Sequence, residues 1–130
     1  MFKGLSPNLM VAEVDRSLAF YRDVLGFEVV MTMPEEGTPI WGMVKRGAVD
    51  IMLQASESLG QEYPSLAGRP IGATLTLYLE VSDIQALYDE LKGKVEPVRD
   101  LQTMDYGMRE FAVCDGDGYI LVFGQQVSQA

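Results

Sequence analysis

The sequence predicts an α+β protein made of two tandem βαβββ modules. Two observations predict this fold class: the order strand, helix, strand, strand, strand occurs twice, and the two copies align when Val11 is placed on Val81. A chain of 130 residues, 48% of them hydrophobic, can bury a substantial core. We therefore expect a single domain over residues 1–130, with modules over about 1–55 and 74–126 and a connection over about 56–73.

The first module opens with a short apolar run over residues 5–11, which predicts a strand. Apolar residues at helical spacing follow, and Gly26 marks the end of that helix. Further strands are predicted over residues 27–31, 40–45 and 49–53, separated by turn residues.

The second module repeats this order after a connection, residues 55–73, that is rich in Ser, Gly, Pro and Ala and has no clear periodicity. Residues 75–81 predict a strand, and a helix with one apolar face ends at Gly93. The remaining predicted strands cover residues 95–98, 110–114 and 119–124.

The alignment of the two copies places similar side chains on one another. With Val11 on Val81, Val14 falls on Ile84 and Glu13 falls on Asp83. This agreement predicts a duplicated module. A chance likeness between two short amphipathic segments is the alternative.

Composition limits the possible functions. The formal charge of −9 disfavours binding to nucleic acid; it favours cationic ligands, or it serves only solubility. No segment is long and apolar enough to be a signal peptide or to span a membrane, and Cys114 is the single cysteine, so we expect a cytoplasmic protein. The absence of histidine removes imidazole as a metal ligand and as a general base.

Two motifs resemble a known superfamily. Residues 7–11 (PNLMV) and 14–27 (VDRSLAFYRDVLGF) resemble the opening module of the vicinal oxygen chelate superfamily, which includes glyoxalase I, extradiol dioxygenases and bleomycin-resistance proteins. Residues 106–111 (YGMREF) and 115–119 (DGDGY) resemble the "WGxREF…DPDG" ending typical of bleomycin-resistance-like members. The resemblance covers nearly the whole chain.

The resemblance implies the glyoxalase/bleomycin resistance fold, a curved mixed sheet around a cup. It also implies a homodimer with binding grooves at the subunit junction. Metal-dependent members hold their metal at four strand positions, where this chain has Ser6, Met52, Thr76 and Val122. Because Met and Val offer no hard donor, we expect no metal site and no cofactor.

Transferring those positions also predicts which face of each strand lines the cup. Side chains alternate along a strand, so Asn8, Asp50, Tyr78 and Glu80 are expected on the cup face, and the intervening aliphatic residues on the helix face. A half-solvated antiparallel sheet, which alternates in the same way, is the alternative.

The candidate site residues follow from these arguments. Ligand-binding candidates are Trp41, Met52, Thr76, Tyr78, Tyr106, Arg109, Phe111 and Val122. Trp41 could instead pack in the core or at a dimer interface, and Arg109 could pair with Glu110 or Asp105. Glu80 and Asp50 are candidate bases, with solvated strand ends as the alternative. The DGDG stretch at 115–118 predicts a hairpin turn rather than a calcium loop.

Three functional hypotheses remain open. The first is a metal-free protein, resembling bleomycin-resistance proteins, that sequesters a cationic or aromatic small molecule. The second is an enzyme of the same superfamily, of a lyase or isomerase-like kind, that works without metal through a carboxylate base. The third is a partner-binding or regulatory module, in which the acidic surface matters more than the cup.

Overall fold

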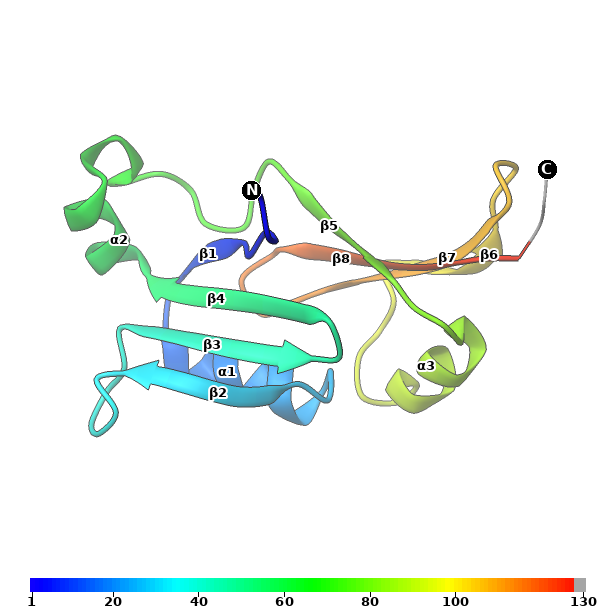
Figure 1. Cartoon of the computed structure of the whole chain (residues 1–130), viewed down its shortest axis with the longest axis horizontal. Helices are drawn as coiled ribbons and strands as arrows, with labels where there is room; N and C mark the ends of the chain where they lie inside the picture. Colours follow the sequence, from blue (N-terminus) through cyan, green and yellow to red (C-terminus); the bar gives the residue numbers. More distant parts are fainter. Residues whose placement is uncertain (128–130) are drawn as a thin grey trace. The chain divides into compact units, whose positions relative to one another are not determined.

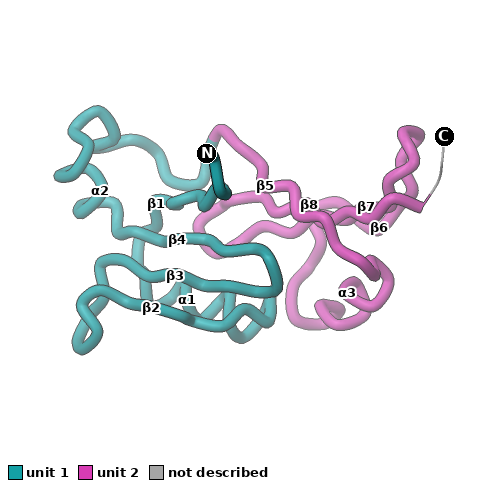
Figure 2. The backbone as a smooth tube through the Cα atoms, viewed as in Figure 1, with its two compact units in different colours: residues 1–73 teal, residues 74–130 magenta. Residues whose placement is uncertain are grey.

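The computed structural model describes residues 1–127. The chain divides into two compact units, unit 1 over Met1–Ala73 and unit 2 from Thr74 onward (Figure 2). Within residues 1–127, no helix is long and apolar enough to cross a membrane.

Unit 1 is a four-stranded mixed sheet with one long helix against it (Figure 1). The sheet order is β1-β4-β3-β2, in which β1 and β4 are parallel and the other neighbours antiparallel. Its elements are β1 (Asn8–Val11), α1 (Val14–Asp23), β2 (Glu28–Met33), β3 (Trp41–Arg46) and β4 (Val49–Ala55).

Unit 2 has the same architecture. Its sheet order is β5-β8-β7-β6, again with one parallel pair, β5 and β8. Its elements are β5 (Thr76–Glu80), α3 (Ile84–Leu91), β6 (Arg99–Thr103), β7 (Met108–Cys114) and β8 (Ile120–Gln126). The predicted α+β fold of two tandem βαβββ modules is therefore confirmed.

Strand register confirms the alignment of the two copies. Asn8 pairs with Met52 in unit 1, and the positions aligned with them, Tyr78 and Val122, pair with each other in unit 2. The two helices also keep the alignment, because α1 begins at Val14 and α3 at Ile84.

Each sheet has a helix-covered face and an open face. Aliphatic and aromatic side chains on the helix-covered face are almost fully buried, which is where burial of apolar surface stabilises the fold. They include Leu9, Val11, Val44, Ile51 and Leu53 in unit 1, and Leu79, Phe111, Val113, Leu121 and Phe123 in unit 2. The alternation predicted from the sequence is present on both sheets.

The connection between the modules is more ordered than we predicted. Residues 55–73 contain α2 (Ser56–Glu62) and a short 3-10 helix, η1 (Pro64–Leu66). Gly60 explains how these segments meet, since a Cβ atom there would lie 3.0 Å from the Cα of Ala67. The segment has no clear apolar periodicity, so the sequence pattern did not show these two helices.

The strand predicted at 95–98 is wrong. The strand of this region is β6, Arg99–Thr103, and residues 95–98 form the irregular segment before it. Pro97 has no N–H to contribute to a ladder, so pairing with β7 begins only where Val98 donates to Ala112 O at 2.8 Å. The sequence predicted a strand at 95–98 because Val95 and Val98 are β-branched, and β-branched residues favour strands.

The turn between β7 and β8 is a hairpin turn, as predicted. The buried Asp115 side chain accepts hydrogen bonds from the backbone N–H groups of Asp117 and Tyr119, both at 2.9 Å. The carboxylate thus satisfies the turn's own backbone donors.

The two faces of β4 can be compared by two alanine substitutions. Leu53→Ala, on the helix-covered face with no exposed surface, should lower the free energy of unfolding by about 2–5 kcal/mol. Met52→Ala, on the open face and partly exposed, should cost less than half as much. Urea denaturation of both variants measures this difference, and equal losses would contradict the assignment of faces.

Candidate functional site

The open face of unit 2 contains a buried carboxylate, that of Glu110 on β7. Only 1% of this residue is exposed, although it lies on the face that no helix covers. Three donors surround it: Tyr78 Oη at 2.6 Å, Tyr106 Oη at 2.9 Å and Arg99 Nη2 at 2.6 Å. A buried carboxylate is tolerable only with such partners, and here a guanidinium and two phenols supply them.

Gly124 allows Tyr78 to reach this carboxylate. Tyr78 lies on β5 and Glu110 on β7, and β8 lies between these two strands. On β8, Gly124 pairs with Glu110, whereas Tyr78 pairs with Val122, so the Tyr78 side chain crosses β8 diagonally. A Cβ atom at Gly124 would lie 2.1 Å from the Tyr78 hydroxyl oxygen. The missing side chain is therefore what lets the tyrosine cross the middle strand.

The cluster holds its protons in a defined state. Burial raises the pKa of the Tyr78 hydroxyl, and its hydrogen bond to Glu110 raises it further. Burial alone would raise the pKa of Glu110, but the hydrogen bonds from Tyr78, Tyr106 and Arg99 outweigh it and leave that pKa below its usual range. At neutral pH the cluster is therefore two neutral phenols and one ion pair, which makes Glu110 a poor proton acceptor.

The tyrosine rings, in contrast to the carboxylate, reach the surface. Tyr78 is 48% exposed and Tyr106 is 58% exposed. Their hydroxyl ends are fixed and their rings are accessible, so together they present a rigid aromatic surface on the open face.

The open face of unit 1 has a different chemistry. Gln54 is buried and accepts from Asn8 Nδ2 at 2.8 Å while it donates to Ser58 Oγ at 2.9 Å. Beside it lie Trp41 and Met43 of β3, both partly exposed. Gln54 stands at the register position that Gly124 holds in unit 2, so an amide network replaces the tyrosine–carboxylate cluster.

The four positions at which metal-dependent relatives would hold a metal do not fit one. Met52 and Val122 lie on the open faces of β4 and β8 without an oxygen or nitrogen donor. Ser6 instead donates a hydrogen bond to Asp50. Within residues 1–127 no three Cys, Asp or Glu side chains are grouped closely enough to coordinate an ion.

The structure places most of the predicted ligand-binding residues on open faces. In unit 1 these are Trp41 and Met52; in unit 2 they are Thr76, Tyr78, Val122 and, through its hydrogen bond to Glu110, Tyr106.

Arg109 and Phe111 lie on the opposite face of β7. Phe111 is 1% exposed and packs edge-on against Tyr88 of α3, with ring centroids 5.2 Å apart. Arg109 donates to Thr103 Oγ1 at 2.8 Å, while Glu110, one of the two acids considered as its alternative partner, binds Arg99. One-residue alternation along β7 separates both residues from the open face.

Neither candidate base is a fully buried carboxylate. Asp50 accepts a hydrogen bond from Ser6, and Glu80 is exposed at the end of β5. The two lie in different units.

The sequence pattern did not indicate Arg99, Gly124 or the central position of Glu110, and it placed Gln54 on the cup face without making it a site candidate. A signal was available for one of them: Glu110 opens the otherwise apolar run of residues 110–113, which predicts a buried acid that needs partners. Arg99 and Gly124 lie far from it in sequence, so only strand pairing reveals their connection to it.

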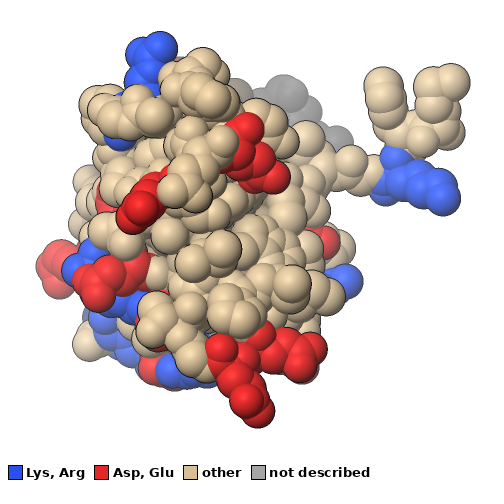
Figure 3. Space-filling model, turned by 90° about the vertical axis from the view of Figure 1, so that its left-hand side faces the viewer, with Lys and Arg blue, Asp and Glu red and all other residues tan. Residues whose placement is uncertain are grey.

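Charge is dispersed on the visible surface. In the face drawn in Figure 3, Asp and Glu side chains form separate groups with Lys and Arg between some of them. The net charge of −9 therefore does not gather into one acidic patch on that face.

Removing the charge of Glu110 should destabilise unit 2 in a pH-dependent way. At pH 7, Glu110→Gln should lower the free energy of unfolding by about 2 kcal/mol, because Arg99 loses its counter-ion; water reaches Arg99, which is 37% exposed, and limits the loss. The folded-state pKa of Glu110 is depressed, so its contribution is complete above the unfolded pKa of about 4.3 and is lost as pH falls through the folded value.

Denaturation of wild type and variant at pH 7 and pH 3 measures this dependence on pH. The two proteins should differ less in free energy of unfolding at pH 3 than at pH 7. Glu80→Gln, an exposed acid on the same face, is the control and should change stability by less than about 0.5 kcal/mol. If wild type and Glu110→Gln differ in free energy of unfolding by the same amount at both pH values, the role of the Glu110 charge is contradicted.

Known proteins share the family and the fold of this chain. The family model "Glyoxalase/Bleomycin resistance protein/Dioxygenase superfamily" matches residues 5–123. A bleomycin resistance protein of Geobacillus stearothermophilus is 28% identical over 125 residues, covering 93% of this chain and 95% of that protein.

Solved structures show the same fold. The bleomycin-binding protein of Streptomyces verticillus, solved with copper(II)-bleomycin, has a TM-score of 0.67 at 24% identity and covers 99% of this chain and 98% of its own. TnmS3, an antibiotic-binding protein of a Streptomyces species, has a TM-score of 0.72 at 19% identity, with 96% and 97% covered. Because the family model spans almost all of the chain, this protein belongs to the glyoxalase/bleomycin resistance protein/dioxygenase superfamily.

Proposed function

We propose that this protein is a metal-free small-molecule binding protein that sequesters an aromatic or cationic ligand on its open sheet faces, without transforming it. One observation supports the proposal above the others: Tyr78 and Tyr106 expose their rings while buried Glu110 fixes their hydroxyl groups. This arrangement serves binding, since the Glu110 carboxylate positions the tyrosines and is itself paired with Arg99.

Preorganisation is the physical advantage of such a site. A flat ligand that stacks on a tyrosine ring gains about 0.5–1.5 kcal/mol beyond simple burial. Side chains that must first be ordered would lose much of that gain to conformational entropy. Here the hydroxyl anchors order the rings before the ligand arrives.

The side chains at the transferred metal positions support ligand binding without a metal. Thioether and isopropyl groups stand at two of the four chelating positions, and no histidine exists to replace them. The chemistry of the ligand class is suggested by the relatives, which include a bleomycin resistance protein and a bleomycin-binding protein. We further propose a cytoplasmic homodimer.

Titration with bleomycin and with planar aromatic cations such as ethidium and acriflavine tests the proposal. We expect saturable binding of at least one of them, unchanged by EDTA because no metal takes part. Isothermal calorimetry or quenching of Trp41 fluorescence measures it. No saturable binding across the panel, or binding abolished by EDTA, would contradict the proposed function.

The aromatic surface is tested with two tyrosines of similar exposure. Tyr106→Ala should weaken binding about fivefold, since one stacking contact of about 1 kcal/mol is lost. Tyr63→Ala is the matched control, because Tyr63 is 54% exposed but lies outside the sheets, and it should change affinity less than about twofold. Equal effects of both would exclude the tyrosine surface as the site.

A further inference from the structure

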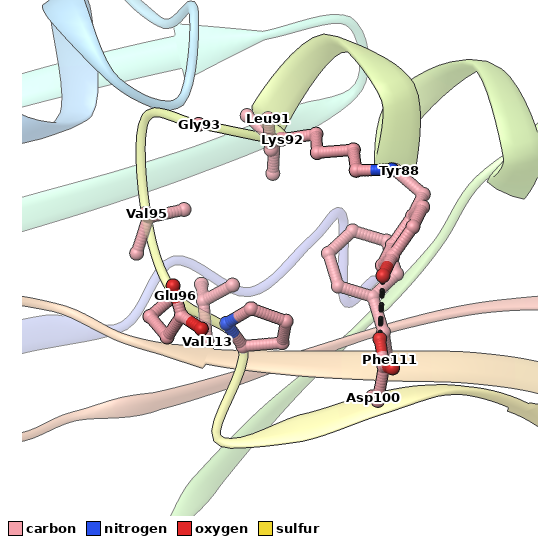
Figure 4. A pocket seen from close by; sticks show the side chains of 10 residues that line it. Tyr88, Leu91, Lys92, Gly93, Val95, Glu96, Asp100, Phe111 and Val113 are labelled. Atoms are coloured by element: carbon pink, nitrogen blue, oxygen red, sulfur yellow. Dashed lines mark hydrogen bonds between the residues drawn. The ribbon is translucent and has the colours of Figure 1, made fainter.

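Unit 2 contains a cavity on the helix-covered side of its sheet, away from the open face described above. It has a volume of about 320 Å³ and lies between α3, the segment that follows it and strands β6 and β7 (Figure 4). Sites for small molecules typically begin near this size, so the space suits a small ligand.

The cavity exists because the segments that lead from the helix back to the sheet differ between the two modules. After α1, the chain returns to the sheet through residues 24–27, and it buries Leu25 and Phe27, which are 2% and 5% exposed. After α3, the return takes residues 92–98, none of which is fully buried. The longer segment bends around the space at the end of the helix instead of filling it (Figure 4).

The floor of the cavity is apolar and partly aromatic. Leu91, Phe111 and Val113 are each at most 2% exposed, and Val95 and Pro97 form the wall on the loop side. The ring of Tyr88 stands edge-on to Phe111, and its hydroxyl is fixed by Asp100 Oδ1 at 2.6 Å. A flat apolar group can therefore enter against ordered rings.

The charged lining residues are two acids and one base. Asp100 accepts from Tyr88, and the positive charge of Lys92 is close enough to act on it. Glu96 also lines the cavity, is exposed, and has no hydrogen-bond or ion-pair partner among residues 1–127. Glu96 is thus a carboxylate available to a cationic group on a ligand.

We propose that this cavity is a second ligand site, which binds a small aromatic amine with its ring on the Phe111–Val113 floor and its ammonium group at Glu96. This site is independent of the proposed function, because it lies on the other face of the sheet and shares no residue with the tyrosine–carboxylate cluster.

Three matched indoles distinguish the contribution of the aromatic ring to affinity from that of the charge. Tryptamine is a cation, 3-methylindole is neutral and indole-3-acetate is an anion, while all carry the same two-ring group. We expect tryptamine to bind about threefold more tightly than 3-methylindole and indole-3-acetate to bind most weakly, a range set by one solvated ion pair. Glu96→Gln should remove the preference for tryptamine and leave 3-methylindole unaffected.

Methyl NMR locates the bound compound. Signals of Leu91, Val95 and Val113 should reach saturation at tryptamine concentrations that leave those of Met52 and Val122 on the open faces unshifted. Bleomycin-type ligands should give the reverse pattern, so failure of one site can be distinguished from failure of the other.

A matched pair of valine substitutions tests the cavity itself. Val95→Phe places a ring in the space and should weaken tryptamine binding at least about tenfold. Val98→Phe adds the same ring on the same segment, but Val98 is 56% exposed and does not line the cavity, so affinity should change less than about twofold. The proposal is overturned if no indole binds saturably, if the open-face signals shift instead, or if both variants bind equally well.

Discussion

The buried carboxylate of Glu110 is the constraint from which the open face of unit 2 follows. A charge with 1% exposure must be hydrogen-bonded, and this requirement accounts for Arg99 on β6 and for two tyrosine hydroxyls directed inward. It also accounts for the glycine at position 124, since any side chain there would block Tyr78. A single acid on β7 thus constrains one residue on each of the other three strands of its sheet: Tyr78 on β5, Gly124 on β8 and Arg99 on β6.

The two sheets share strand order and register but differ on their open faces. Equivalent register positions hold Trp41 and Gln54 in unit 1, and Glu110 and Gly124 in unit 2. The helix-covered faces keep the same aliphatic pattern because burial requires only apolar volume. The open faces carry no such requirement, and their polar and aromatic groups form two distinct surfaces.

The helix-covered side is not identical in the two units either. The short return after α1 buries Leu25 and Phe27, whereas the longer return after α3 leaves a cavity beside Phe111. The apolar side chains on the floor of this cavity lack packing partners on one side, and a bound ligand would supply those contacts. The same sheet of unit 2 therefore presents one preorganised surface and one partly open cavity on opposite faces.

Local sequence patterns were enough to establish the repeated βαβββ order, the alignment of Val14 with Ile84 and the strand residues that face a helix. These features depend on periodicity, which each segment of the chain carries on its own. Composition alone established that histidine chemistry is absent.

The way in which distant residues combine, in contrast, became visible only in the folded chain. Alternation along β7 places Arg109 and Phe111 away from the open face, although the motif containing them suggested a ligand site. Strand pairing brings Arg99, Tyr78 and Gly124 to Glu110 from separate strands, and the length of the segment after α3 opens the cavity. Such contacts depend on register and loop geometry, which local sequence patterns do not encode.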